Sequence, residues 1–377
     1  MRNGVARSVF PQSSPVKLAF ALVPVLCAAI TCAHFFQNEL IDDAYISFRY
    51  VDNFVAGNGL VFNVGERVEG YTNLLWILLL SGFRLFKFDI ELTSQILGVL
   101  CSLGVTILLT NMKSEEVRPF SRGWIAPFAF AIQPAQALWA VHGLETLCFT
   151  LWLTLAFRAD LAILEGRSVR IPSGFWYATA ALTRPEAVAL APIALFLRYG
   201  IAKSRGLPAR LGADIAAFSA IVFVHHVWRF GYYGEWLPNT FFAKEALSWA
   251  VWWRGISYVS HFFSGWDLPL FCALAWACWI EIRNPKVFFS VSLFLVICLI
   301  TVGEGGDSFP GFRFLVPGLP YLYFAFQESW DGVGKKIGPF RWSLGGLLFP
   351  LLLPFTLISL HLLHCLSDVR MEVEGAN

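Results

Sequence analysis

The stretch of sequence that decides the fold is residues 92–112, LTSQILGVLCSLGVTILLTNM, in which 21 consecutive residues include no charged side chain. A helix needs about 20 predominantly apolar residues to cross a bilayer, so this segment predicts a membrane span. Five further runs are predicted spans: 18–36, 123–141, 211–227, 287–302 and 342–365. Three weaker candidates, each shorter or containing proline, begin at Thr146, Leu268 and Phe314. We therefore predict an all-α bundle of membrane helices.

The composition supports this fold class. Of the 377 residues, 57% are hydrophobic and 14% are charged, against about 45–50% and about 25% in soluble domains. One soluble core cannot bury so much apolar surface, which excludes an ordinary cytosolic enzyme and a disordered scaffold. The net charge of +2 and the lack of a basic stripe exclude nucleic acid as a partner. The eight cysteines lie in apolar runs without CxxC spacing, so we expect no disulfide framework.

The distribution of lysine and arginine sets the expected orientation. Cytoplasmic loops carry an excess of basic residues, and this rule places residues 1–17 in the cytoplasm. The apolar run 74–80 must then lie along the membrane surface, because only one crossing can separate the end of the first span from Lys113. The result is about 11 crossings in a single integral-membrane domain, residues 1–377, with a short outer tail at 366–377.

The first outer loop, residues 37–91, has about 55 residues and is too long to be a simple connector. In the first half of this loop, apolar residues recur at helical spacing before Gly57 and Gly59: Ile41, Tyr45, Phe48, Val51 and Val55. In the second half of the loop, an apolar stretch runs from 74 to 86. We predict two amphipathic helices on the outer face of the membrane.

Two short apolar segments, 171–183 and 187–197, are separated by Arg184-Pro185-Glu186. Each segment is too short for a full perpendicular crossing. The pattern predicts a tight hairpin with the tripeptide at its tip, on the outer side.

Polar clusters that do not suit a simple membrane bundle all fall on the expected outer side. Charge at this depth is costly, so convergence of several clusters on one face indicates a site. The clusters are Asp42-Asp43, 66–73, 142–146, 184–186, 232–240 with Lys244, and 305–307 with Arg313.

Asp42 and Asp43 lie where the first span meets the first predicted surface helix. A carboxylate at this position can act as the general base that takes a proton from an incoming hydroxyl. The alternative is a helix cap, since aspartate is a favoured N-cap residue. Both can hold if one caps and the other reacts, and Asp42 is the preferred base.

Three cations are candidates for holding a phosphate at the outer surface: Arg184, Lys244 and Arg313. The arginine fork matches phosphate in charge and geometry. For Arg184 the alternative is an ion pair with Glu186 at the hairpin tip. For Lys244 and Arg313 the alternative is an extended side chain that reaches lipid headgroups.

Further polar side chains of these clusters are candidates for positioning substrate. Arg49 can instead pair with Asp52 at i+3 on the helix surface, and Asp307 can instead be a solvated loop acid. The candidates are Arg49, Glu69, Tyr71, Glu145, Glu186, Tyr233, Asn239 and Asp307. No metal site is expected from the histidines, although two adjacent aspartates are compatible with a divalent ion.

The order of these motifs resembles the first outer loop and later motifs of bacterial GT-C glycosyltransferases. It is similar to the mycobacterial terminal β-(1→2)-arabinofuranosyltransferase family. The resemblance covers residues 38 to about 320. It rests on 42–50, 57–63 and 65–73, followed in order by 143–146, 182–186, 232–240 and 305–315.

The resemblance implies a multi-span protein of the bacterial cytoplasmic membrane, with its active site facing the periplasm or the outside. It further implies a catalytic acid in the first outer loop, a polyprenyl-phosphate-linked sugar as donor, and an extracytoplasmic glycan or lipid as acceptor. One displacement by the deprotonated acceptor inverts the anomeric carbon, and no cofactor is required because phosphate is a good leaving group. The family has a soluble outer domain after its spans, which we expect to be absent because this chain stops soon after Cys365.

Two other functions stay open. A flippase or transporter of lipid-linked sugars places ionisable residues near the bilayer midplane and often contains paired repeats, whereas the predicted spans are nearly free of central charge and no repeat is visible. A non-catalytic scaffold does not need carboxylates beside cations on one face. The sequence also lacks GxxxxGK[ST], GxGxxG, GxSxG and HExxH motifs, so a transferred sugar must be carried in the membrane.

Overall fold

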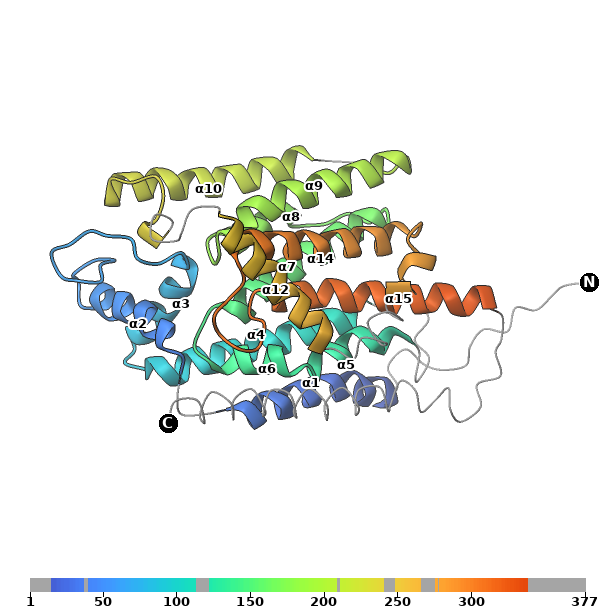
Figure 1. Ribbon diagram of the computed structural model, residues 1–377, viewed down its shortest axis with the longest axis horizontal. Coiled ribbons are helices and arrows are strands. Elements are labelled where there is room, and N and C mark those ends of the chain that lie inside the picture. Colours follow the sequence, from blue (N-terminus) through green and yellow to red (C-terminus); the bar gives the residue numbers. More distant parts are fainter. Residues whose placement is uncertain are drawn as a thin grey trace, which may run out of the picture.

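The computed structural model describes residues 15–36, 40–112, 122–208, 211–240, 248–265, 275–276 and 278–337. Within these ranges every regular element is helical, as the sequence predicts (Figure 1). Lys244, the span predicted at 342–365, the candidate span that begins at Leu268 and the outer tail lie outside the described residues.

The bounds of the helices are as follows. In chain order they are α1 (Pro15–Phe35), α2 (Asp42–Val55), α3 (Leu74–Arg84), α4 (Ile90–Asn111), η1 (Arg122–Trp124), α5 (Ile125–Ala131), α6 (Pro134–Val141), α7 (Thr146–Leu164), α8 (Ser173–Ala181), α9 (Glu186–Ser204), α10 (Gly212–Tyr233), α12 (Trp249–Gly265), α14 (Pro285–Glu304), η2 (Val316–Gly318) and α15 (Leu319–Ile337).

Four helices in the described residues are long and apolar enough to cross a membrane: α4, α7, α9 and α14. The protein is thus a multi-pass membrane protein, and the total of about 11 crossings stays a prediction. Aromatic packing joins two of these helices in the core, where Phe157 of α7 stacks on Phe289 of α14 with ring centroids 6.1 Å apart. Phe324 of α15 meets the same Phe157 ring edge-on at 5.3 Å.

The hairpin predicted at 171–197 is present as α8 and α9, but one of its limits was wrong. The helix α9 continues for 19 residues, beyond the apolar run that ends at Leu197, and is long enough to cross. The reason is that the charge of Arg198 is neutralised inside the bundle by Asp160 and Asp214, so the helix passes through this residue without exposing it.

The single span predicted at 123–141 is interrupted. The helix α5 ends at Ala131, and α6 begins at Pro134. Proline has no amide hydrogen and disfavours helical geometry in the residue before it. Gln133 accordingly has an extended backbone, with φ −69° and ψ 118°.

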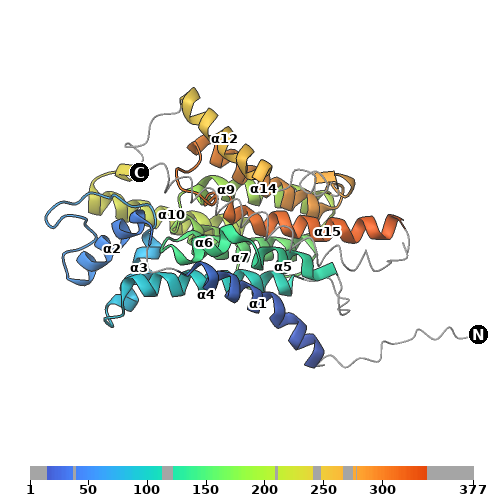
Figure 2. The same ribbon diagram turned by 60° about the horizontal axis from the view of Figure 1, so that its bottom comes forward.

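The two helices of the first outer loop are present at the predicted positions, and both views place them at one end of the bundle (Figures 1 and 2). In α2 the buried face includes Ala44, Phe48 and Val51. The helix ends just before Gly57, whose φ of +84° is unfavourable for residues with a side chain. Their position on the membrane surface stays a prediction.

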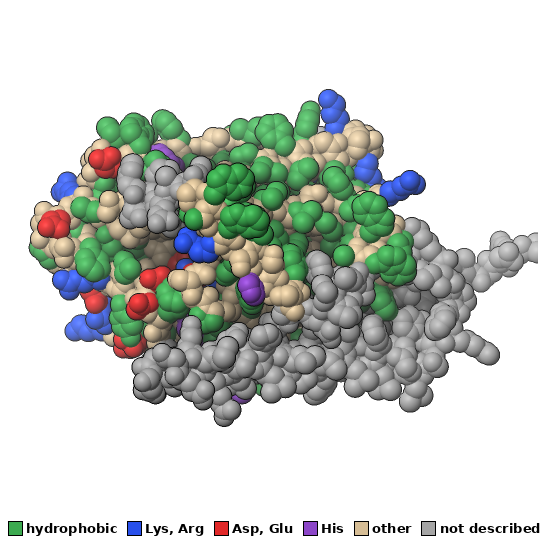
Figure 3. All heavy atoms as spheres, in the orientation of Figure 1, with side chains coloured by type: hydrophobic (Ala, Val, Ile, Leu, Met, Phe, Trp, Pro, Cys, Tyr) green, Lys and Arg blue, Asp and Glu red, His purple; other side chains and the backbone are tan. Residues whose placement is uncertain are grey.

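The bundle has two chemically different ends. At the end near α2, which we call the site end, α7 and α9 begin and α14 finishes, and a contact between Arg184 and Glu145 joins two of these termini. At the opposite end, Lys286 at the start of α14 contacts Glu165 just after α7, with 3.0 Å between Nζ and Oε1. In Figure 3 acidic side chains are visible at the site end together with Lys and Arg side chains, whereas the charged side chains visible at the opposite end are Lys and Arg.

Candidate active site

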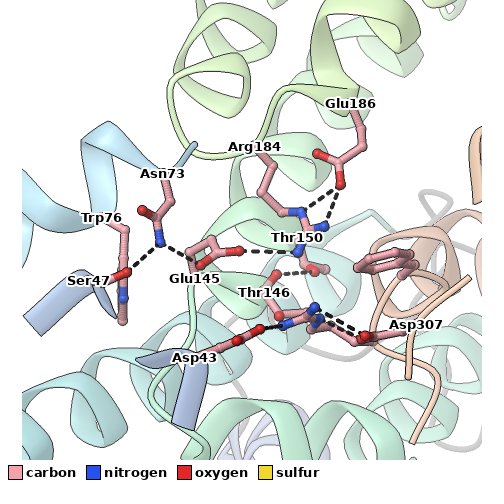
Figure 4. Close-up of polar contacts among 12 residues, drawn as sticks. Asp43, Ser47, Asn73, Trp76, Glu145, Thr146, Thr150, Arg184, Glu186 and Asp307 are labelled. Carbon is pink, nitrogen blue, oxygen red and sulfur yellow. Dashed lines mark hydrogen bonds and ion pairs between the residues drawn. The ribbon is translucent and has the colours of Figure 1, made fainter. Parts of the chain in front are cut away.

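Arg184 lies at the tip of the α8–α9 hairpin and is held by carboxylates from two elements (Figure 4). Its Nη1 donates to Glu145 Oε1 at 3.1 Å, and its Nε donates to Glu186 Oε1 at 3.0 Å. The ring centroid of Phe314 lies 4.9 Å from the guanidinium carbon. The side chain is 11% exposed. The ion pair considered from the sequence as the alternative to phosphate binding is therefore formed.

The space beside Arg184 is small. The cavity lined by Arg184, Glu186 and Phe314 has a volume of about 20 Å³, enough for about one water molecule. A sugar does not fit there, whereas the Asp43 side chain is 44% exposed and more accessible to a substrate.

A second arginine, Arg313, lies in the loop after α14 and again meets two carboxylates. Its Nε is 2.8 Å from Asp307 Oδ2, and its Nη1 is 3.8 Å from Asp43 Oδ2. The Trp139 ring covers the guanidinium carbon at 5.3 Å. The Arg313 side chain is 11% exposed, whereas that of Asp43 is 44% exposed. This arrangement joins the first outer loop to a loop some 270 residues further along the chain.

The two adjacent aspartates have different surroundings. Oδ1 of Asp42 accepts the amide hydrogen of Asp43 at 2.9 Å, and the Asp42 side chain is exposed. The Asp43 carboxylate instead faces Arg313 (Figure 4). The sequence favoured Asp42 as the base, but this geometry favours Asp43, with Asp42 making the local helix-terminal contact.

Burial is the largest cause that raises the pKa of the Asp43 carboxyl above its ordinary value. The positive charge of Arg313 opposes this rise. Three nearby carboxylates add to it: Asp42, Asp307 and Glu145. Burial, with a smaller contribution from these acidic groups, therefore makes Asp43 a stronger proton acceptor than an isolated aspartate.

Asn73 links Glu145, a partner of Arg184, to the helix α2 that carries Asp43, and the sequence analysis did not single it out. Its Nδ2 donates to Glu145 Oε2 at 2.8 Å and to Ser47 Oγ at 3.0 Å, one turn after Asp43 on α2. Trp76 donates from Nε1 to the Gly143 carbonyl at 3.2 Å. The available signal was a polar residue directly before the apolar run of α3.

Four of the predicted positioning residues form a separate group, which we call the tyrosine clamp: Glu69, Tyr71, Tyr233 and Asn239. The Tyr71 and Tyr233 hydroxyls are 3.0 Å apart, and Tyr233 donates to the Leu60 carbonyl at 2.7 Å. The backbone amide of Asn239 donates to the backbone carbonyl of Glu69 at 2.9 Å. These contacts tie the first outer loop to the end of α10.

A buried arginine that the sequence analysis missed completes the clamp. Arg229 Nε lies 2.7 Å from Glu69 Oε2, and both side chains are buried. Burial raises the pKa of Glu69, whereas Arg229 opposes the rise. The clamp residues contact one another and hold the loop, and their substrate-positioning role stays a prediction.

Arg49 also holds this loop. Its Nε donates to the Phe62 carbonyl at 3.1 Å. The alternative pair with Asp52 was wrong, because Asp52 instead contacts Arg84 of α3, with 2.8 Å between Oδ1 and Nε. The side chain one turn away on the same helix was a poorer partner than one on the neighbouring helix.

Among the described residues, no group of three or more His, Cys, Asp and Glu side chains is arranged to hold a metal ion.

No family model matches the chain. Two curated relatives are named terminal β-(1→2)-arabinofuranosyltransferase. The protein from Corynebacterium glutamicum is 26% identical over 359 residues, which cover 79% of this chain and 50% of the relative. The protein from Mycobacterium tuberculosis is 29% identical over 242 residues, covering 60% and 38% respectively. This chain thus spans half or less of the length of these relatives, and the resemblance stated from the motifs is confirmed.

A crystal structure of ArnT from Cupriavidus metallidurans in the apo state has the same fold. The two structures superpose with a TM-score of 0.63 at 14% sequence identity, over 89% of this chain and 62% of ArnT. ArnT is a GT-C glycosyltransferase. At this identity the likeness establishes the architecture of the helices and nothing about the substrate.

Proposed function

We propose that the chain is an integral-membrane, inverting glycosyltransferase that moves a sugar from a polyprenyl-phosphate donor to an extracytoplasmic glycan or lipid acceptor. The relatives named arabinofuranosyltransferases and the ArnT-like fold support the class of enzyme. The observation that carries the proposal is the approach of Asp43 to Arg313 and Asp307 at the site end.

Asp43 is the proposed general base. Its carboxylate takes the proton of the acceptor hydroxyl while the hydroxyl oxygen bonds to the anomeric carbon of the donor. The bond between that carbon and the phosphate oxygen breaks, and its electron pair leaves with the polyprenyl phosphate. A single displacement inverts the anomeric centre. The raised pKa of Asp43 suits this role, because a base works best when its pKa approaches the working pH.

Arg313 supplies positive charge next to the base. Its guanidinium keeps Asp43 oriented and offers stabilisation to the charge that develops on the leaving phosphate. Asp307 holds the Arg313 side chain in place at 2.8 Å. Arg184 is proposed as a positioning residue, because Glu145 and Glu186 already occupy its fork and the adjoining cavity is too small for a sugar. The phosphate-binding role of Lys244 stays a prediction.

The proposed orientation places the site end outside the cytoplasm and the amino terminus inside. The basic residues at the opposite end support this orientation under the positive-inside rule: Arg167, Arg205 and Lys286. The membrane is then the bacterial cytoplasmic membrane, and the acceptor approaches from the outer face.

The test uses the full chain reconstituted in lipid vesicles with radiolabelled polyprenyl-phosphate sugars, beginning with the arabinofuranosyl donor. Transfer of label to glycan or lipid acceptors supports the proposal. Movement of label across the bilayer without transfer contradicts it and supports the flippase. A parallel reaction with a metal chelator tests the proposal that no divalent ion is needed: undiminished transfer supports that proposal, and loss restored by a divalent cation contradicts it.

A further inference from the structure

Arg254 of α12 is an arginine of the site end that the sequence analysis did not single out. It is exposed, and its Nε donates to the Gly305 carbonyl, a neutral partner, at 3.0 Å. Arg184 and Arg313 each lie between two carboxylates. Within the described part of the chain, no carboxylate forms an ion pair with Arg254. Its contact with the rest of the site end is instead the hydrogen bond to this backbone carbonyl.

Arg254 lies directly on the loop that carries the site. A Cβ atom added to Gly305 would lie 2.9 Å from Arg254 Nη2, and one added to Gly306 would lie 2.6 Å from Tyr258 Cβ. The two glycines thus permit close packing of α12 on this loop. Asp307 follows immediately and holds Arg313, which faces Asp43. A chain of contacts through this loop thus connects Arg254 with the proposed base.

The surroundings of Arg254 place it at the level of lipid headgroups. Trp249 is 80% exposed and Trp253 is 65% exposed, and both belong to the first turns of the same helix. Tryptophan is enriched at the boundary between membrane and water. An exposed arginine among such side chains is suited to bind the phosphate of a membrane lipid.

We infer that Arg254 binds the phosphate of the polyprenyl-phosphate donor and holds it beside the loop that carries Asp307 and Arg313. This inference rests on the proposed function, because it assigns the donor-phosphate contact of the same site. It separates the work of the three arginines: Arg184 holds the hairpin tip, Arg313 lies beside the base, and Arg254 binds the donor.

The experiment measures two quantities for the full chain in phosphatidylcholine nanodiscs. The first is the Kd for sugar-free undecaprenyl phosphate and decaprenyl phosphate, which requires no transfer. The second is the KM for the donor in the transfer reaction. Arg254→Gln is expected to raise both by at least about tenfold, since a hydrogen bond to a charged group is lost. Arg254→Lys keeps the positive charge but not the planar fork of the guanidinium. Its Kd and KM are expected to lie between those of the wild type and those of Arg254→Gln.

The matched control is Lys87→Gln. Lys87 is an exposed cation at the same end, beside the exposed rings of Phe86 and Phe88, and the proposed site does not use it. Its variant is expected to bind and transfer like the wild type. An equal loss of affinity in both variants would show a general attraction of anionic lipid to surface cations and would overturn the assignment of Arg254.

The outcomes separate this inference from the proposed function. If the wild type transfers sugar and Arg254→Gln keeps the wild-type Kd and KM, the inference is wrong and the proposed function stands. If the wild type binds polyprenyl phosphate in an Arg254-dependent way but transfers no sugar from any donor, the proposed function is wrong and the phosphate site stands. A reduced affinity of Arg254→Gln for phosphatidylglycerol vesicles alone would assign the residue to bulk lipid instead. Should Arg254→Gln unfold, Arg254→Lys carries the same comparison.

Discussion

Arg198 and Arg313 each meet two carboxylates, at opposite ends of the bundle, and the two groups differ in solvent exposure. Arg198 at the opposite end is 1% exposed, with 2.8 Å from Nη2 to Asp214 Oδ2 and 3.3 Å from Nη1 to Asp160 Oδ1. At the site end, Arg313 lies 3.8 Å from Asp43, whose side chain is 44% exposed.

The carboxylates around Arg198 are fully used. Tyr177 donates to the second oxygen of Asp160 at 2.8 Å. Ser173 and the amide of Gly174 donate to the second oxygen of Asp214 at 3.0 and 3.1 Å. A buried ionisable group within membrane helices is by default a candidate functional site, but a network with every oxygen partnered has no capacity for a ligand. We therefore assign the Arg198 network to the stability of the bundle and the Arg313 cluster to chemistry.

The largest expected effect concerns the Arg313 cluster. Asp43→Asn removes the proposed base and is expected to lower the transfer rate by about 10²–10⁴-fold. The free energy of unfolding should change little, because the Asp43 side chain is half exposed. Asp42→Asn is the matched control, and its transfer rate is expected to fall less than that of Asp43→Asn. Rates of transfer from labelled donor measure both, and a larger loss in Asp42→Asn would return the base to the residue that the sequence favoured.

The Arg198 network should show the reverse behaviour, a loss of stability without a loss of transfer. Arg198→Met leaves Asp160 and Asp214 buried without their cation, so we expect the free energy of unfolding to fall by about 3–5 kcal/mol. Transfer per folded molecule should be unchanged. Denaturant unfolding in detergent measures the loss. Replacing both aspartates by asparagine in the same chain should recover part of it, and full stability of the single variant would contradict this assignment.

A smaller effect is expected in the tyrosine clamp. Tyr71→Phe removes the hydroxyl contact to Tyr233 and should cost about 0.5–1.5 kcal/mol of stability. Tyr233→Phe should cost more, because it also removes the donor to the Leu60 carbonyl. Unfolding and proteolysis of the first outer loop check this order. A changed KM for acceptor without lost stability would instead support the substrate contact predicted from the sequence.

The smallest effect is expected for the surface pair of Asp52 and Arg84. Both side chains are substantially exposed, so Asp52→Asn should cost at most about 1 kcal/mol and less at high salt. Unfolding at two salt concentrations measures it. A larger, salt-independent loss would mean that this pair holds α2 against α3 as firmly as a buried contact does.

The elements with local causes could be predicted from the sequence. The spacing of apolar residues from Ile41 to Val55 and the glycine at 57 define α2, and the uncharged run at 92–112 lies within α4 and the residue after it. The convergence of acidic and basic motifs at one end was also predictable, because an even number of crossings returns the chain to the same side.

The partners of the charged residues could not be predicted. Arg184 meets Glu145, which is 39 positions away, and Arg198 meets Asp160 and Asp214 across three helices. A sequence shows that a cation is present but not whether a distant carboxylate already occupies it. The same limit hid Asn73 and Arg254, whose importance depends on contacts with residues far along the chain.

The most direct measurement of the central claim is the dependence of kcat/KM on pH for sugar transfer in the wild type and in Asp43→Asn. The base must be ionised, and burial raises its pKa. The wild-type value should therefore fall as the pH drops through a pKa above that of an ordinary aspartate, about 3.9. The residual activity of Asp43→Asn should lack this acid limb. An acid limb of the same position and slope in Asp43→Asn would contradict the assignment of Asp43 as the base.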